Sequence, residues 1–234
     1  VEDIYSDMTY NLVPADSAKS AKLMILAKYL WFDAYSEAMG PTFVKENVPR
    51  VIHLIGSPAY NSGDGTIVLG TAEGGYVITL YMVNELTDAM LHDYDTMNEY
   101  YFHTMHHEFT HILNQKKNYS ENYQLITEDG YVSGDWYQIA DHDAHTAGFV
   151  TPYAMSEPGE DFAEMMSVYV TNSPEQWDAI IKDAGEEGGA LINKKLTMVR
   201  SYMKDSWGLD IDKMRDIVQR RASEISALDL TTLE

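Results

Sequence analysis

The sequence contains a pair of histidines that could bind a metal ion, in His107-Glu108-Phe109-Thr110-His111. Two histidines four residues apart on a helix differ by about 40° around its axis, so both can face one ion. Zn²⁺ accepts neutral imidazole nitrogens at about 2.0–2.1 Å. Glu108 lies about 100° further round, where it can reach a metal-bound water without being a ligand. The pattern predicts His107 and His111 as ligands of one Zn²⁺ ion and Glu108 as general base.

A helix over residues 95–116 is expected to carry this motif. It has an apolar stripe opposite His107 and His111 that could be buried in a core. The stripe consists of Phe102, Met105, Phe109, Ile112 and Leu113. Two further histidines, His103 and His106, are not predicted to be ligands. His103 lies roughly 12 Å along the axis from His111, and His106 points about 100° away from His107. Both are interpreted as supporting or merely polar residues.

A catalytic zinc site usually has three protein ligands and a water, so one ligand is still needed. The chain has no cysteine, and Asn114 and Lys117 stand where the metzincin extension needs Gly and His. The best remaining candidate is Glu160, which shares one face of an expected helix with Glu164. We predict that Glu160 ligates zinc and that Glu164 accepts a hydrogen bond from a ligand histidine, which fixes its tautomer.

Periodicity alone also fits an ordinary amphipathic helix whose acidic face is solvated. Alternatives for the third ligand therefore stay open at three places: Asp161, the pair Glu128 and Asp129, and the acidic and histidine cluster at 141–145. A fourth protein ligand would make the zinc site structural instead of catalytic, and His142 or His145 would be the place to look for it.

Strands are expected before the zinc helix and helices after it. A first helix fits residues 17–39, followed by strands at 50–55, 66–69 and 76–83. After the loop-rich stretch 118–158, helices are expected at 156–171, 173–184, 190–207 and 210–228. This order favours α+β: a small twisted sheet packed on the HExxH helix, then a mainly helical C-terminal lobe. We expect a single domain over 1–234, with the sheet and zinc helix in about 1–117 and the third ligand from 118–234.

Composition excludes some classes of function. The net charge of −21 disfavours nucleic acid and anionic membrane surfaces. No run approaches the roughly 18 apolar residues of a membrane span, because Lys28 and Asp33 interrupt the longest one. The first residues have neither the basic nor the apolar region of a signal peptide, which indicates a mature or trimmed form or a cytosolic protein.

HEFTH followed after about fifty residues by GEDFAE resembles the gluzincin pattern of the lethal-factor-like peptidases. In that family the first Glu of an E-x-x-A-E helix ligates zinc, and a Tyr seven residues earlier stabilises the transition state. The resemblance implies that Tyr153, seven residues before Glu160, donates a hydrogen bond to the oxyanion. It also implies a zincin-like fold in which a sheet-edge strand beside the zinc helix binds the peptide, for which 76–83 is the candidate unless it is paired on both sides.

The whole chain is similar to the substrate import-associated zinc metallohydrolase lipoproteins of Bacteroidetes. The similarity is carried by HEFTHILNQ, GFVTPYAMSEPGEDFAEM and WGLDID. It implies a cell-envelope protein, exported or lipid-anchored at the outer membrane, with a TonB-dependent importer and its surface lipoprotein as partners. The anchor rests on this resemblance, since the given chain has no lipobox.

The predicted function is zinc-dependent hydrolysis of a peptide or protein substrate, associated with nutrient import. The alternative is a zinc-containing accessory protein of an import complex with little or no turnover. Glu108 favours the enzyme, because a pure binding protein needs no base there. Trp31, Trp136 and Tyr137 could line a substrate pocket, although aromatic side chains in a tyrosine-rich chain are more often part of the core.

Overall fold

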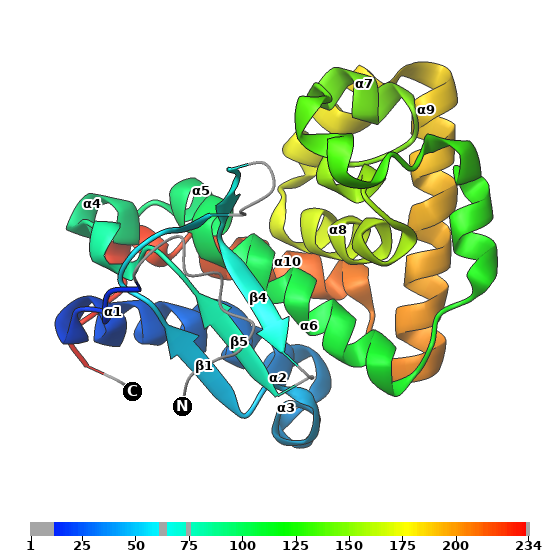
Figure 1. Cartoon of the computed structure of the whole chain (residues 1–234). Coiled ribbons are helices and arrows are strands. Elements are labelled where there is room, and N and C mark those ends of the chain that lie inside the picture. Colours follow the sequence, from blue (N-terminus) through cyan, green and yellow to red (C-terminus); the bar gives the residue numbers. More distant parts are fainter. Residues whose placement is uncertain (1–11, 61–64, 74–75, 233–234) are drawn as a thin grey trace.

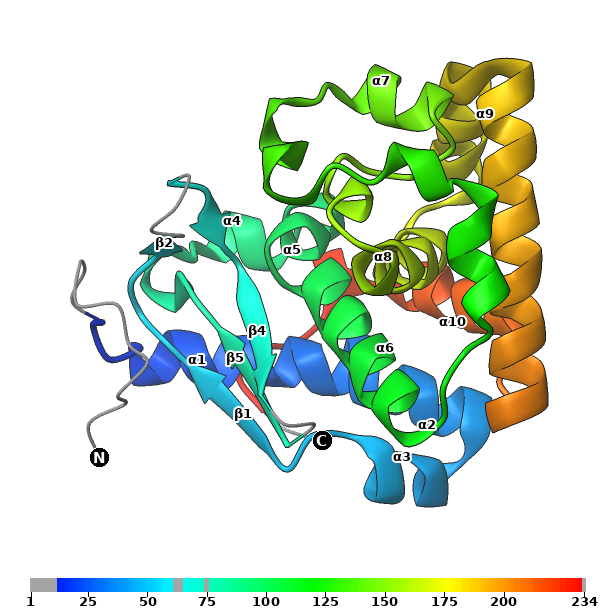
Figure 2. The ribbon, with the colours of Figure 1, turned by 45° about the vertical axis from the view of Figure 1, so that its right-hand side comes forward.

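The computed structural model describes residues 12–60, 65–73 and 76–232. A small sheet and helix α1 (Ser17–Ala27) form one side of the molecule, and the long helix α9 (Pro174–Tyr202) forms the other. Helices α6 (His103–Lys116) and α8 (Pro158–Thr171) lie between them (Figures 1 and 2). The mixture of many helices and one small sheet agrees with the predicted α+β class.

The first predicted helix is present over its whole length. Asp16 caps α1 by accepting hydrogen bonds from the backbone N–H groups of Ala18 and Lys19. A wider π-helical turn at Lys28–Phe32 joins α1 to α2 (Asp33–Met39) without a break. The helix ends at Gly40, whose φ of +85° suits glycine, and Pro41 begins α3 (Pro41–Asn47).

The main sheet has three strands in the order β1-β5-β4. β1 (Val51–Leu54) is parallel to β5 (Val77–Leu80), and β4 (Gly70–Glu73) is antiparallel to β5. Of the two possibilities left open for 76–83, the structure shows the buried one, because β5 is paired on both sides and Ile78 and Leu80 are fully buried. The strand is therefore not the edge strand that a peptide could join. The strand that contacts α6, the helix with the His107 and His111 motif, is β4.

Two further strands, β2 (Ala59–Tyr60) and β3 (Ile67–Val68), pair with each other in a separate antiparallel ribbon. The run predicted as a strand at 66–69 thus belongs to this ribbon and not to the main sheet. The remaining short elements are α4 (Asp88–Leu91), α5 (Tyr94–Met97), a π turn at Asn98–Phe102, and 3₁₀ turns at Val83–Glu85, Glu121–Ile126, Glu128–Gly130, Ser133–Gln138, Tyr153–Met155 and Ile225–Ala227.

Helix α6 and the turn before it, which carry the His107 and His111 motif, bury the predicted apolar face. Each of the five stripe residues is at most 1% exposed. Trp31 is also fully buried, and its ring meets that of Phe109 edge to face at 5.1 Å. Trp31 therefore belongs to the core, which is the commoner place for an aromatic side chain in this chain, and does not line a substrate pocket.

The C-terminal half is helical after the loop-rich stretch, in which α7 (Asp141–Thr146) is a short helix. The helices predicted at 173–184 and 190–207 form one element, α9, with a kink at Gly185 (φ +70°) and a π turn at Met203–Trp207. Gly185 has non-helical dihedrals, so α9 consists of two helical segments that meet at this kink, next to the predicted end of the first helix at 184. The last helix is α10 (Ile211–Ala222).

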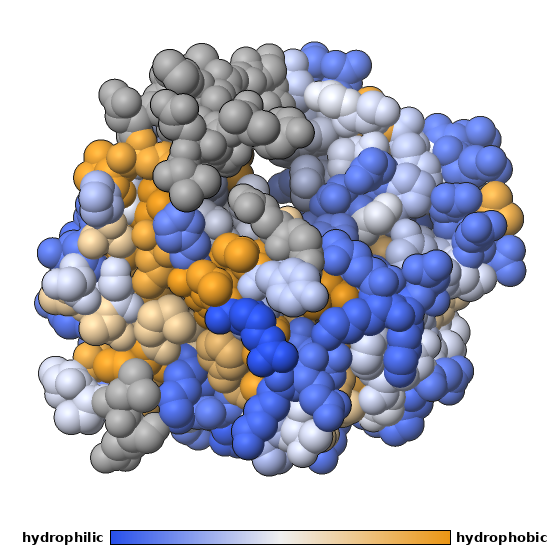
Figure 3. All heavy atoms as spheres, turned by 60° about the horizontal axis from the view of Figure 1, so that its bottom comes forward, coloured by the Kyte–Doolittle hydropathy of each residue, from blue (hydrophilic) through white to orange (hydrophobic). Residues whose placement is uncertain are grey.

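Buried residues from the first helix, the sheet, α6, α8, α9 and α10 form one hydrophobic cluster. Seen from below, hydrophobic side chains gather on the sheet side of the surface, whereas the opposite side is largely hydrophilic (Figure 3). The exposed apolar residues on the sheet side include Leu12, Val13 and Val51. In the described ranges, no helix has the length and apolar character needed to span a bilayer.

Candidate metal centre

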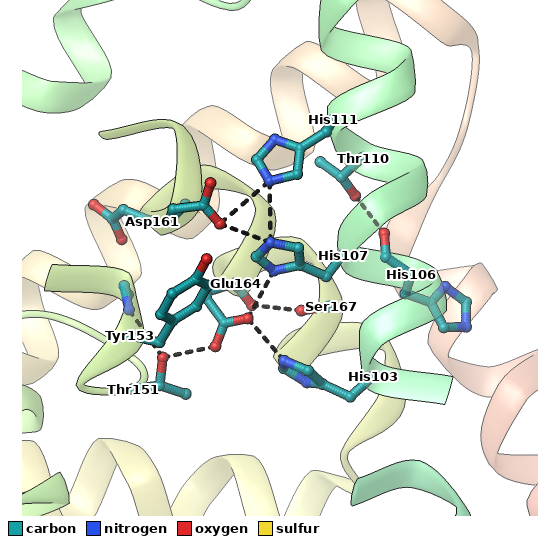
Figure 4. A network of polar contacts seen from close by, with 12 residues as sticks. His103, His106, His107, Thr110, His111, Thr151, Tyr153, Asp161, Glu164 and Ser167 are labelled. Carbon is teal, nitrogen blue, oxygen red and sulfur yellow. Dashed lines mark hydrogen bonds and ion pairs between the residues drawn. The ribbon is translucent and has the colours of Figure 1, made fainter. Parts of the chain in front are cut away.

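The candidate site lies where α6 packs against α8. His103, His107 and His111 project from one side of α6 toward α8, because the three residues are spaced by four (Figure 4). His106 points to the other side of α6, where its Nδ1 is 3.0 Å from the hydroxyl of Tyr35. Burial lowers the pKa of His106 to about 3, so this ring is neutral and belongs to the core.

Three potential ligand atoms converge at the middle of this interface. His107 Nε2 lies 2.8 Å from Glu160 Oε2 and 3.0 Å from His111 Nε2, and His111 Nε2 lies 3.3 Å from Glu160 Oε2. Ligands about 2.05 Å from a tetrahedral zinc ion are about 3.3 Å from one another. The spacing of the three atoms therefore suits one shared ion.

The polar contacts of His107 also suit a positive charge at this point. His107 Nδ1 donates a hydrogen bond to Glu164 Oε1 at 2.8 Å, so Nε2, which faces the Glu160 carboxylate, either carries a second proton or offers its lone pair to a metal ion. Burial lowers the pKa of His107, but hydrogen bonds to Glu160 and Glu164 outweigh burial and raise the pKa to about 10. Either a proton or a metal ion must balance these lone pairs, and two imidazoles with one carboxylate are ligands that zinc accepts.

Glu164 lies behind the ligands and is 3% exposed. Its carboxylate receives hydrogen bonds from His103 Nε2 at 2.7 Å, His107 Nδ1 at 2.8 Å and Thr151 Oγ1 at 2.6 Å. Burial raises the pKa of Glu164, but the charge and hydrogen bonds of the two histidines hold it well below its usual range.

The ligand atoms of His103, His107 and Glu164 also lie close enough together to form a second possible metal group. This group would use Nδ1 of His107, whereas the first group uses Nε2 of the same ring. A ring that binds metal through Nε2 keeps its proton on Nδ1. The second group is therefore a hydrogen-bonded layer behind the first and not a second metal site.

Glu108 lies on the side of the site that faces the sheet. Its carboxylate accepts a hydrogen bond from the backbone N–H of Ala72 on the edge strand β4, and burial raises its pKa above the usual range. The nearby charges of His107 and His111 act in the opposite direction. A carboxylate placed beside the ligands with a raised pKa has the properties of a general base.

Tyr153 lies on the α8 side of the site, in a 3₁₀ turn, with its ring centroid 5.8 Å from that of His107. Its hydroxyl interacts with Glu160, and burial together with the Glu160 charge raises its pKa, so the phenol keeps its proton. The ring of Trp136 packs edge to face on Tyr153 at 4.9 Å. Tyr153 is 37% exposed and Tyr137 is 45% exposed, so this side of the site is open to solvent.

The other candidate ligands lie apart from the converging atoms. Asp161 is fully buried and pairs with Lys195 Nζ at 2.6 Å. His142 and His145 both pair with Asp183 on α9. In the part of the chain that the structure describes, neither group of possible metal ligands includes Asp161, Glu128, Asp129 or the 141–145 cluster. The alternative of a solvated acidic face on α8 is wrong, because Asp161 and Glu164 are buried.

A groove of about 390 Å³ lies beside His111 and the end of α6. Its lining includes four amide side chains, those of Asn114, Gln115, Asn118 and Gln124. The sequence did not predict this groove. It also did not predict the hydrogen bonds that Thr151 donates to Glu164 and the Ala72 N–H donates to Glu108. For His103 the sequence had left a supporting role and a merely polar role open. Its place four residues before His107, the spacing that also separates His107 from His111, is the signal for the supporting role.

Comparisons with known proteins place this geometry in context. The chain matches, over residues 1–212, the model of a family described as "putative zinc-binding metallo-peptidase". It is also similar to the crystal structure of a "putative zinc-binding metallo-peptidase" from Bacteroides caccae, with 42% identity and a TM-score of 0.81. The match covers 99% of this chain and 87% of that one. No curated protein matches the chain.

Proposed function

The chain belongs to the zinc-binding metallo-peptidase family whose model it matches, and on this premise we propose that it hydrolyses peptide bonds as a zincin-like, gluzincin-type enzyme. The observation that carries the proposal is the convergence of His107 Nε2, His111 Nε2 and Glu160 Oε2 within 3.3 Å of one another. One Zn²⁺ ion held by these three side chains would lower the pKa of a water to about 7 and polarise the substrate carbonyl.

The remaining residues of the site have distinct tasks. Glu108, with its raised pKa, takes the proton of the attacking water and passes it to the leaving amine. Tyr153 keeps its phenolic proton and donates it as a hydrogen bond to the developing oxyanion. Glu164 holds the proton on His107 Nδ1, so that Nε2 is free to act as a ligand.

The substrate strand is assigned to the edge strand β4 in place of β5. Among the described strands, β4 pairs with β5 alone, and it also contacts α6. Ala72 in β4 donates its N–H to Glu108, so this strand passes directly beside the proposed base. A peptide added alongside β4 as a further strand would bring its carbonyl groups close to the metal ligands.

The cellular setting follows from the family resemblance. A cell-envelope enzyme, lipid-anchored at the outer membrane or exported, would act on peptide or protein substrates beside a TonB-dependent importer and its surface lipoprotein. The motifs shared with the import-associated lipoproteins support this setting, and so does the similar chain from a Bacteroides species.

A direct test compares the wild-type protein with Glu108→Gln, both loaded with zinc, against a peptide library. We expect both proteins to contain about one zinc per chain and only the wild type to cleave. Zinc binding without cleavage by either protein would favour the accessory-protein alternative. Failure of the wild type to bind zinc would refute the proposal.

A further inference from the structure

We propose that His103 is a positioning residue that orients the zinc ligand His107 through the carboxylate they share, that of Glu164. This inference rests on the proposed function, since it takes His107 as a ligand. It gives a task to a histidine that the motif itself does not contain.

Hydrogen bonds connect the side chains of His103 and His107 through the carboxylate of Glu164. His103 Nε2 is 2.7 Å from Glu164 Oε1, and His107 Nδ1 is 2.8 Å from the same oxygen. The two histidines stand one turn apart on α6, so a single oxygen of α8 can bind both (Figure 4). Thr151 Oγ1 holds the other oxygen of Glu164 at 2.6 Å.

Because Glu164 and His107 are buried, the loss of one of these hydrogen bonds should affect the others. Glu164 is 3% exposed and His107 is 5% exposed, so water cannot replace a lost donor at this carboxylate. A buried carboxylate that loses a donor bears part of its desolvation cost and turns toward any other donor within reach. Such a rotation would move Oε1 away from His107 Nδ1. The ring would then lose the contact that fixes both its tautomer and the direction of its Nε2 lone pair.

His103 acts through Glu164 and not as a ligand. Its nitrogen is hydrogen-bonded to Glu164, whereas the converging ligand atoms belong to His107, His111 and Glu160. The His103 side chain is 26% exposed, more than that of His107 or Glu164, so it is the member of the three that lies nearest the surface. Partners of this kind change metal affinity by about 10- to 100-fold when they are removed.

The test measures zinc affinity by competition with a chelator, which does not depend on turnover. We expect His103→Leu to weaken zinc binding by about 10- to 100-fold and His103→Gln, whose amide N–H can still donate, to restore most of that affinity. Thr151→Val, which removes the other donor to Glu164, should also weaken binding. The visible absorption spectrum of the Co²⁺-loaded protein should shift in His103→Leu and return toward wild type in His103→Gln.

His106→Leu is the matched control, since it removes a histidine hydrogen bond on the opposite side of the same helix. It should keep wild-type zinc affinity in the folded protein, as judged by circular dichroism. Equal losses in His103→Leu and His106→Leu would overturn the inference, and so would wild-type zinc affinity in His103→Leu, whatever Thr151→Val does. A wild-type protein that binds no zinc would refute the proposed function itself, a result distinct from these.

Discussion

Glu160 and Asp161 are adjacent acids in the first turn of α8, and their side chains serve different purposes. Glu160 Oε2 approaches His107 and His111, whereas Asp161 Oδ2 is bound by Lys195 Nζ and the hydroxyl of Tyr131. Side chains one position apart on a helix differ by about 100° in direction, so only one of the two can face α6. The proposed metal site therefore depends on which acid occupies which position.

Replacing each acid by its amide should separate the two roles. Glu160→Gln should lower zinc affinity by at least about 100-fold, because an amide oxygen is neutral and a weak zinc ligand. Asp161→Asn should leave zinc affinity within about threefold of wild type while lowering thermal stability, because it weakens a buried ion pair. Chelator competition and thermal melts of both variants check this. The reverse order of zinc affinities would contradict the choice of Glu160.

Tyr153 should matter for turnover and not for zinc binding. Tyr153→Phe removes one donor to the oxyanion while keeping the ring that packs on Trp136. We expect kcat to fall by about 100- to 1,000-fold with KM and zinc content little changed. Steady-state kinetics on a cleaved peptide measure this. Unchanged kcat would remove Tyr153 from the catalytic residues.

At the scale of residues, the sequence predicts those members of the site that are spaced along a helix. His107, His111, Glu160 and Glu164 are regularly spaced on two helices, so their faces can be worked out from residue numbers alone. Thr151 and Ala72 reach the site from a loop and a strand, and their places depend on tertiary packing that no local period encodes. Tyr153 came from the family resemblance, since no periodicity points to it.

At the scale of elements, the sequence predicts most helices but not the order of the strands. The sequence predicts the strand at 76–83 because Val77, Ile78 and Leu80 form an apolar run. A central strand such as β5 is buried on both faces, and this burial favours apolar residues. The edge strand Gly70–Glu73 has little apolar or β-branched character, so nothing marked it beforehand. Strand order follows from long-range pairing, and here it moves the proposed substrate strand from β5 to β4.

The buried pair of Asp161 and Lys195 ties the start of α8 to α9. Both side chains are fully buried, and burial lowers the pKa of Lys195 to about 8. Lys195→Met would leave a buried carboxylate without its cation, at a cost of about 3–5 kcal/mol. The double variant Asp161→Asn/Lys195→Met should be more stable than the single one, because no charge is then left unpaired. Urea unfolding measures both, with the exposed Lys194→Met as control; a single variant as stable as the control would refute this role.

At the scale of the whole molecule, a helix near the beginning of the chain, α2, contacts a helix near its end, α10. Glu37 on α2 accepts hydrogen bonds from Arg220 at 2.7 Å and from Arg221 at 2.9 Å, both on α10. These helices also pack against each other within the main hydrophobic cluster. The expectation that residues 1–234 form one domain is consistent with this contact between α2 and α10, and it stays a prediction.

The Glu37 pair should make the stability of the whole molecule depend on pH in acid. A hydrogen bond from Arg221 lowers the pKa of Glu37 below its ordinary value of 4.5. A carboxyl group whose pKa is lower in the folded state stabilises the fold above its unfolded pKa, and this contribution is lost as pH falls through the folded pKa. Wild type should therefore lose stability relative to Glu37→Gln as pH falls below about 4.5.

The measurement is the difference in Tm between wild type and Glu37→Gln from pH 7 to pH 3. The difference should be positive at pH 7 and shrink in acid, but stay small because the Glu37 side chain is 40% exposed and solvent screens the pair. Glu186→Gln, at an exposed position of α9, changes the net charge by the same amount and serves as the control for the general repulsion of a chain with net charge −21. If both variants follow the same pH profile, the acid sensitivity comes from net charge alone and the contact between α2 and α10 contributes nothing specific.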